Sequence, residues 1–258
     1  VYRFHIEPEA FEAVAASLEF AVERPKLYSI SVNGAPCDFR NGTSWFDEEI
    51  RKVSIKDLVQ AGENTVCLRC RPFHVLAETM AVHLLGEFAL RPAERGFTLI
   101  AAQPVTLGDW TKQGRPFDSF GLRYRFQFDL SEPASGIEVD FGGEARASLI
   151  EGAIDNRPAG STFFPHRPLE LRHELEAGEH ILDLRVRGSL KNLMGPLHND
   201  GLPGPWSWQY SPESQPSGRD YRREPSGLLT APQIRPLAAA NSEVKGESTC
   251  MTASNRLP

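Results

Sequence analysis

Apolar and polar residues alternate in short runs along most of the chain. In residues 122–130 the large apolar side chains alternate with Arg123, Arg125 and Gln127, and a period of two residues is typical of a strand with one buried face. Only residues 9–16 and 55–60 suggest a helical turn. Strands are predicted at 17–22, 27–32, 51–55, 64–70, 81–90, 97–101, 121–130, 136–141, 146–150, 169–174 and 180–187. The pattern therefore predicts an all-β fold.

One combination of elements occurs twice. Ala61-Gly62-Glu63 and Ala177-Gly178-Glu179 each form a turn before an alternating strand, and a tight turn precedes each of them, at 31–36 and 153–158. A repeat at the spacing of a whole domain indicates two similar units. Short strands with Gly, Pro, Asn and Asp between them favour β-sandwiches of jelly-roll or immunoglobulin-like connectivity.

The domain organisation follows from this repeat. The 258 residues suffice for two ordinary domains. We expect a first β-sandwich in residues 1–102, beginning inside a domain because residues 1–6 are already strand-like. A second sandwich is expected in 103–236, closed by a last strand at 227–234. Residues 237–258 contain few large apolar side chains, which predicts a disordered tail or residues left from cloning.

Composition excludes several classes of partner. The net charge is −6 and no run of Lys and Arg occurs, which argues against nucleic acid and against an anionic membrane surface. No apolar stretch approaches the roughly 20 residues that span a bilayer. Cys67 and Cys70 lie three apart on a predicted strand and therefore point to opposite faces, which argues against a zinc or redox CxxC site.

Several segments together resemble a known kind of accessory region. They are Phe46–Asn64, Leu85–Phe88, Leu107–Phe117 and Arg187–Asn199, of which Lys191-Asn192-Leu193-Met194-Gly195-Pro196 is the most unusual. They resemble the C-terminal, non-catalytic region of large bacterial glycoside hydrolases related to family two and to the α-L-rhamnosidases. The terminal jelly-roll modules of those enzymes are called sugar-binding or galactose-binding-like.

The resemblance implies an accessory module that binds or positions a neutral oligosaccharide or polysaccharide, next to a catalytic domain that this sequence lacks. It also implies a bacterial protein that is secreted or periplasmic. No cofactor is expected and no metal-binding motif occurs, although some sandwiches of this type hold a structural calcium, a point that the sequence leaves open.

A loop supplies candidate sugar-binding residues. Pyranose rings stack on aromatic side chains, and their hydroxyls pair with amides, carboxylates and imidazoles. In an extended segment, alternate residues face the same way, so three rings of this loop would form a ribbon. The alternative is that these rings hold the loop against the sandwich. The candidate ligand-binding residues are Trp206, Trp208, Tyr210, His198, Asn199 and Asp200.

Two acidic pairs keep a catalytic alternative open. A glycosidase needs two carboxylates about 5 to 10 Å apart across the scissile bond. Glu151 with Asp155, or Asp47 with Glu49, would supply them in a small stand-alone hydrolase. The simpler interpretation of such clusters is a solvated turn, and we therefore favour no catalytic residues. A third alternative is a structural or protein-interaction module that docks on the catalytic domain through exposed aromatics.

The remaining tryptophans have structural interpretations. Trp110 lies between the two predicted domains, and we expect it to pack at their interface. Trp45 and Phe46 follow the polar run 41–44 and are expected to cover one edge of a sandwich.

Overall fold

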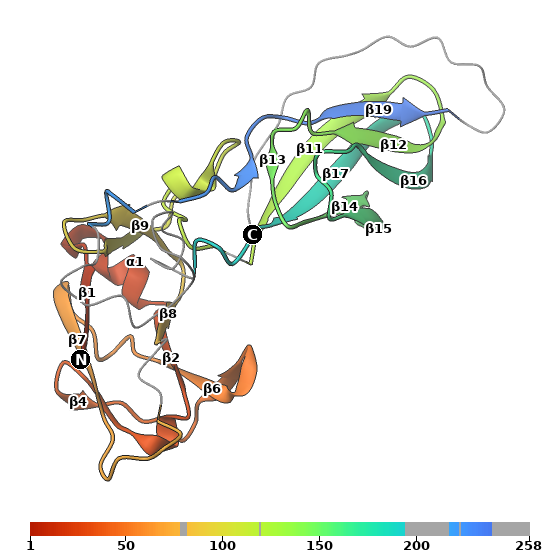
Figure 1. The fold of residues 1–258 in the computed structure, drawn as a ribbon. Coiled ribbons are helices and arrows are strands. Elements are labelled where there is room, and N and C mark those ends of the chain that lie inside the picture. Colours follow the sequence, from red (N-terminus) through yellow and green to blue (C-terminus); the bar gives the residue numbers. More distant parts are fainter. Residues whose placement is uncertain (78–81, 119, 194–216, 222, 239–258) are drawn as a thin grey trace, which may run out of the picture. The chain divides into compact units, whose positions relative to one another are not determined.

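A computed structural model describes residues 1–77, 82–118, 120–193, 217–221 and 223–238 (Figure 1). Strands account for 47% of the chain and helices for 7%, which confirms the predicted all-β, β-sandwich class. The chain forms two compact units. The first comprises Val1–Gln103 with Pro212–Tyr221, and the second comprises Pro104–Ser211 with Arg222–Pro258.

The first unit contains two sheets. The six-stranded sheet has the order β4-β3-β7-β1-β10-β9, and the four-stranded sheet has the order β5-β6-β2-β8. Neighbouring strands are antiparallel except for the parallel pair β1–β10. Their bounds are β1 (Tyr2–Ile6), β2 (Glu19–Glu23), β3 (Ser29–Val32), β4 (Ala35–Pro36), β5 (Thr43–Trp45), β6 (Asp47–Ser54), β7 (Gly62–Arg69), β8 (His83–Leu85), β9 (Phe88–Pro92) and β10 (Phe97–Ala101).

The core of the first unit lies on the inner faces of these strands and beneath one short helix. Phe20 and Val22 of β2 contribute to it, whereas Ala21 between them faces the other way. The helix α1 (Phe11–Ala15) follows the 3-10 turn η1 (Pro8–Ala10), as the sequence predicts for 9–16, and it buries Val14. A second 3-10 turn, η2 (Pro25–Leu27), leads into β3.

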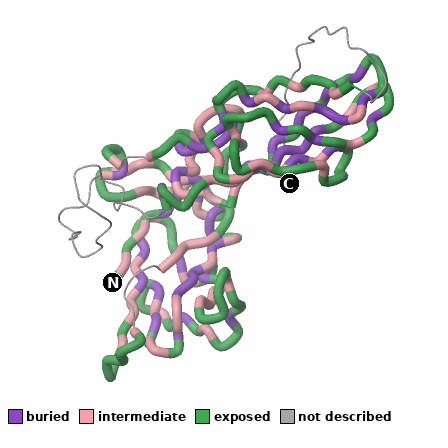
Figure 2. Tube along the Cα trace, turned by 45° about the vertical axis from the view of Figure 1, so that its right-hand side comes forward, coloured by how far each residue is buried: buried purple, intermediate pink, exposed green. Residues whose placement is uncertain are grey.

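The second unit is a sandwich of a four-stranded sheet, β11-β17-β14-β15, and a three-stranded sheet, β16-β12-β19, with a small pair β13-β18. Alternate residues of β11 are buried and exposed without exception, as predicted. Figure 2 shows short buried and exposed stretches along the trace of both units. The bounds are η3 (Trp110–Lys112), β11 (Leu122–Leu130), β12 (Ala134–Asp140), β13 (Ala145–Arg146), β14 (Leu149–Ile154), β15 (Arg157–Thr162), β16 (Leu169–Leu175), β17 (Gly178–Arg187), β18 (Gly227–Leu228) and β19 (Gln233–Leu237).

The predicted repeat is present in the sheets, and it extends over four strands. The order β4-β3-β7-β1 of the first unit matches β15-β14-β17-β11 of the second. The register matches as well, which is significant because a slip of one residue would exchange the buried and exposed faces. The matching pairs are Ile6 opposite Gly62 with Leu130 opposite Gly178, Tyr2 opposite Val66 with Phe126 opposite Leu182, and Val32 opposite Val66 with Ile154 opposite Leu182.

A side chain in each tight turn fixes this register. Asn33 and Asp155 begin the two turns with positive φ angles of 50° and 49°, a conformation that Asn and Asp tolerate better than most residues. The Oδ1 atom of Asn33 accepts from the N–H of Thr65 at 2.9 Å, and Oδ1 of Asp155 accepts from the N–H of Ile181 at 2.9 Å. Each turn is therefore tied to the strand that follows the Ala-Gly-Glu turn.

The two copies differ in the polar residue next to this hydrogen bond. In the first, the amide of Asn33 donates to Oδ1 of Asn64 at 2.8 Å, and Asn64 is fully buried. In the second, Nδ1 of His180 lies 2.7 Å from Oδ2 of Asp155, and Nε2 lies 2.9 Å from the carbonyl oxygen of Glu176. Both ring nitrogens face acceptors, so the protonated imidazolium fits the site best.

Residues 55–60 contain a single turn, in which the N–H of Leu58 donates to the carbonyl of Ile55 at 2.9 Å. The side chains of Asn33 and Asn64 bond the carbonyl of Leu58 and the N–H of Gln60. Three sequence predictions need correction. The strand predicted at 81–90 is divided at Gly86 into β8 and β9, and the one predicted at 227–234 is divided into β18 and β19. Trp110 is fully buried in the core of the second unit, so the interface interpretation was wrong.

The pair His180–Asp155 makes stability depend on pH. Burial alone would lower the pKa of His180, but its hydrogen bonds to Asp155 and Glu176 and the charge of Asp155 outweigh burial and raise it. Burial alone would raise the pKa of Asp155, but bonds from His180 and the Ile181 N–H lower it. The stabilisation from His180 is fully present below the pKa of an unfolded histidine, about 6.5. The stabilisation from Asp155 is fully present above the pKa of an unfolded aspartate, about 3.9.

We therefore predict that the second unit is most stable between about pH 4 and pH 6.5, and that the histidine contribution is lost as pH rises through the raised pKa of His180. His180→Asn copies the residue at the equivalent position of the first unit and should remove this alkaline loss. Urea unfolding of both proteins from pH 5 to pH 9 measures it. If the free energy of unfolding of His180→Asn depended on pH in the same way as that of the parent protein, the alkaline loss of stability would not come from His180.

Candidate functional site

The predicted sugar-binding residues Trp206, Trp208, Tyr210, His198, Asn199 and Asp200 lie outside the described residues, and they stay a prediction. In two of the segments that carry the family resemblance, a polar side chain holds the backbone in place. Asn192 donates to the carbonyl of Glu224 and accepts from its N–H, both at 2.8 Å. Asp109 accepts from the N–H of Thr111 at 3.0 Å and of Ser226 at 3.2 Å. These motif residues thus fix backbone segments of the second unit.

The first acidic pair has its own partners. Glu151, on β14, bonds Nε of Arg187 at 2.9 Å, and Asp155 bonds His180 and the Ile181 N–H. Asp155 lies four positions after Glu151, just beyond the end of β14, which corresponds to roughly 13 Å along an extended backbone. This placement gives no support to a shared substrate between the two carboxylates, because a glycosidase pair lies about 5 to 10 Å apart.

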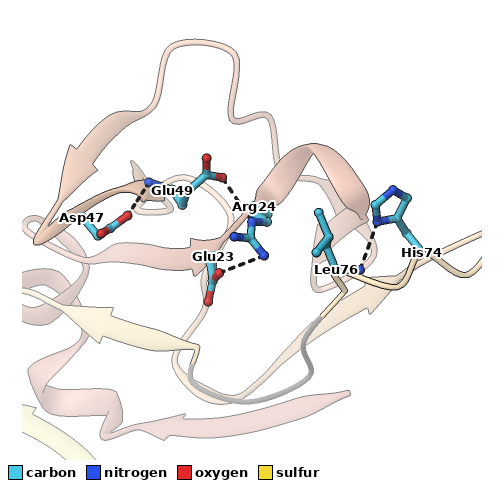
Figure 3. Close-up of polar contacts among 6 residues, drawn as sticks. All are labelled: Glu23, Arg24, Asp47, Glu49, His74 and Leu76. Carbon is cyan, nitrogen blue, oxygen red and sulfur yellow. Dashed lines mark hydrogen bonds and ion pairs between the residues drawn. The ribbon is translucent and has the colours of Figure 1, made fainter.

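The second acidic pair lies in a polar turn of the first unit (Figure 3). Oδ1 of Asp47 accepts from the N–H of Glu49 at 2.8 Å, and Oε2 of Glu49 lies 3.3 Å from Nε of Arg24. The side chain of Glu49 is 60% exposed. Arg24 also pairs with Glu23 at 3.4 Å. A carboxyl group that donates a proton near neutral pH needs a desolvated environment, which this exposed and paired cluster does not provide.

Nearby in the sequence, an aromatic cluster lies on the outer face of the four-stranded sheet. The ring centroids of Trp45 and His83 are 5.0 Å apart, although their strands β5 and β8 are at opposite edges of that sheet. Ala21 pairs with His83 on one side and Lys52 on the other, and it is fully buried. A small residue at Ala21 lets the two rings meet above the sheet.

Polar neighbours hold this cluster in position. The guanidinium of Arg51 donates to the hydroxyl of Ser44 at 3.1 Å and to the carbonyl of Gly42, which fixes the strand that carries Trp45. Burial lowers the pKa of His83, so its ring is neutral near pH 7 and can both donate and accept a hydrogen bond. Lys52 pairs with Glu19 at 2.7 Å beside the rings.

Phe46 extends the cluster into solvent. It forms the tip between β5 and β6, its ring centroid lies 6.2 Å from that of Trp45, and 85% of the residue is exposed. Its φ angle is +66°, a conformation that costs a bulky residue about 1–2 kcal/mol. The expectation that Phe46 covers a sandwich edge is therefore wrong. A strained, exposed aromatic ring does not stabilise the fold, which makes Phe46 a candidate binding residue.

Sequence reasoning missed this cluster because it joins residues 38 positions apart. The doublet Trp45-Phe46 before Asp47 was the available signal, but nothing in the sequence shows that β8 brings His83 to the same face. The name aromatic cluster is used below for Trp45, Phe46 and His83.

The described part of the chain shows no group of three or more His, Cys, Asp and Glu side chains that could hold a metal ion. None of its helices has the length and apolar character needed to cross a bilayer. Cys37, Cys67 and Cys70 are free thiols, and burial, aided by the charge of Asp38, raises the pKa of Cys37 to about 11. Thiolate chemistry at Cys37 is thereby disfavoured.

Comparisons with known proteins identify no family for this chain. No family model matches the chain, and no curated protein matches it. Among solved structures, the chain is similar to a rhamnosidase from Novosphingobium sp. PP1Y, with 15% identity, a TM-score of 0.36 and coverage of 81% of this chain. The chain spans only 20% of the length of that rhamnosidase. A likeness of this degree carries no argument about function.

The strain at Phe46 leads to a stability prediction. Phe46→Gly should raise the free energy of unfolding of the first unit by about 0.5–1 kcal/mol, because glycine adopts positive φ without the steric cost. The matched control is Phe73→Gly in the same unit, where the ring is also exposed but φ is not positive.

Phe73→Gly should lower stability by about 0.5–1 kcal/mol, because glycine adds freedom to the unfolded chain. Urea unfolding followed by circular dichroism measures both variants. If Phe46→Gly lost as much stability as Phe73→Gly, the ring would be a structural element and not a strained ligand contact.

Proposed function

We propose that this chain is a carbohydrate-associated pair of β-sandwiches that binds a neutral glycan without cleaving it. The observation that carries the proposal is the aromatic cluster on the outer face of the first unit, with Phe46 strained and 85% exposed at its tip. Aromatic faces stack on the C–H faces of pyranose rings, and the neighbouring imidazole, ammonium and carboxylate groups can bond sugar hydroxyls.

The sequence resemblance to accessory regions of bacterial glycoside hydrolases supports the same function. Under this proposal the catalytic domain of the parent enzyme is the expected neighbour, and the binding unit keeps that enzyme near its polysaccharide. Hydrolysis by the chain alone is disfavoured, because Glu49, Glu151 and Asp155 pair with Arg24, Arg187 and His180, and Asp47 accepts from the N–H of Glu49 within its own turn.

The Phe46→Gly variant should bind glycans more weakly although its free energy of unfolding should rise. We expect Phe46→Gly to weaken neutral oligosaccharide binding about tenfold, by analogy with the loss of one stacked ring. Titration calorimetry with neutral plant cell-wall oligosaccharides measures the change, with Phe73→Gly as the control for an exposed phenylalanine outside the cluster. Binding that is unaffected by Phe46→Gly would remove the aromatic cluster from consideration.

The loop residues predicted from the sequence provide an independent test. If Trp206, Trp208 and Tyr210 form a second stacking surface, Trp208→Ala should weaken binding about tenfold with little change in melting temperature. If these rings instead hold their loop, the substitution should cost about 3–5 kcal/mol of folding free energy. Melting curves and binding isotherms of Trp208→Ala distinguish the two.

A catalytic activity would require a different interpretation. Aryl-glycosides assayed with the intact chain test this alternative directly. Turnover that is lost in Glu151→Gln or Asp47→Asn, with the fold preserved, would favour a stand-alone hydrolase over a binding module.

A further inference from the structure

The outward face of the β11–β17 pair carries four arginines at one end. Arg123 and Arg125 alternate with buried residues on β11, and Arg185 and Arg187 do so on β17. The strands β11 and β17 lie side by side (Figure 1). The two strands pair with Arg123 directly opposite Arg185. Side chains on one face are spaced about 7 Å along a strand and about 5 Å across a pair. These four residues are called the arginine array below.

Two members of the array are neutralised and two are not. Arg125 binds Asp183 through two contacts of 3.0 and 3.1 Å, and Arg187 binds Glu151 at 2.9 Å. Arg123 and Arg185 form no ion pair or side-chain hydrogen bond with any residue in the described ranges. Like charges directly opposite one another destabilise a sheet. Arg185 lies between Arg123 on β11 and Glu151 on β14, and Glu151 pairs with Arg187, so the guanidiniums of Arg123 and Arg185 are available to an added anion.

The first unit serves as an internal comparison. In the matching strands, Ser29 faces Arg69 where Glu151 faces Arg185, and Ser31 faces Cys67 where Ala153 faces Asp183. At the same spacing Arg71 takes the place of Arg187, so the first unit keeps two of the arginines and neither carboxylate. The combination of arginines with Glu151 and Asp183 is therefore specific to the second unit among the positions that can be compared.

We propose that the arginine array binds the carboxylate of an acidic sugar, a uronic acid residue of a polysaccharide, between Arg123 and Arg185. A carboxylate accepts hydrogen bonds on both oxygens and so satisfies two guanidiniums at once. The choice of a sugar as the bearer of the carboxylate rests on the proposed function and extends it from neutral sugars to a polysaccharide that also carries uronic acid residues, whereas the choice of a carboxylate rests on the array itself.

The charges around the array favour a ligand with a single negative charge, or with negative charges that lie far apart. The array and its two carboxylates together carry +2, while the whole chain carries −6, which opposes the approach of a dense polyanion. Nucleic acid, with a charge every few ångströms, fits this surface poorly. A single carboxylate on an otherwise neutral ring matches it.

The neighbouring residues of the same face suit a sugar ring. Gln127 follows Arg125 on β11, and it faces Ile181, which is 38% exposed. An amide can pair with ring hydroxyls, and an exposed aliphatic side chain can contact the C–H face of a pyranose. At the far end Asp129 faces Glu179, so a second carboxylate of the ligand would be repelled there.

The test uses a mono-uronate oligosaccharide, a neutral oligosaccharide that carries one glucuronate residue, and compares it with its methyl ester, which has the same sugars without the charge, by titration calorimetry of the full chain. We expect the mono-uronate oligosaccharide to bind, its affinity to fall with salt, and the methyl ester not to occupy the array. Arg123→Gln and Arg185→Gln should each weaken binding of the mono-uronate oligosaccharide about tenfold or more. Arg172→Gln on β16, which pairs with Glu170, is the charge-matched control and should leave it unchanged.

Several results would overturn the assignment. Acetate or inorganic phosphate bound as tightly as the mono-uronate oligosaccharide would exclude a sugar-specific site. Unchanged binding in Arg123→Gln and Arg185→Gln, or no binding of the mono-uronate oligosaccharide at all, would exclude the array. Because Phe46→Gly leaves this face intact, it should retain binding of the mono-uronate oligosaccharide, and a failure of the array is thereby distinguished from a failure of the aromatic cluster.

Discussion

The alternation of strand side chains between two faces is the constraint on which both candidate sites depend. In β11 every second residue enters the core, so Arg123 and Arg125 must point outward. In β2 the buried Phe20 and Val22 force Ala21 to the outer face, where it is covered by rings from two other strands. A sandwich that buries one face of each sheet leaves the other face available for recognition.

The alternation also shows why the fold was more predictable than the candidate site. Period two is a local signal, so the strands of the second unit and the two Ala-Gly-Glu turns could be identified from the sequence. The sequence indicates that β7 and β17 are equivalent strands, but it does not show which residues of the neighbouring strands lie opposite them. The meeting of Trp45 with His83 is non-local and depends on strand order, which no sequence spacing encodes.

Two outcomes depend on hydrogen bonds between segments that are distant in sequence. The turn at 55–60 does not continue into a helix, because the side chains of Asn33 and Asn64 bond its backbone groups, and such bonds compete with helix formation. Trp110 was assigned to the interface on position alone, yet its N–H donates to the carbonyl of Ser226, and the side chain of Asp109 accepts from the N–H of Ser226, where the ring enters a core. Sequence spacing shows neither contact.

One segment of the first unit comes from late in the chain. The N–H of Gly218 donates to the carbonyl of Ala93 at 3.0 Å, and the ring of Tyr221 meets that of Phe97 edge to face. A side chain at Gly218 would collide with the carbonyl of Gly96. During synthesis on the ribosome, the first unit therefore cannot complete its contacts until most of the second has left the exit tunnel, so the two mature together rather than in sequence.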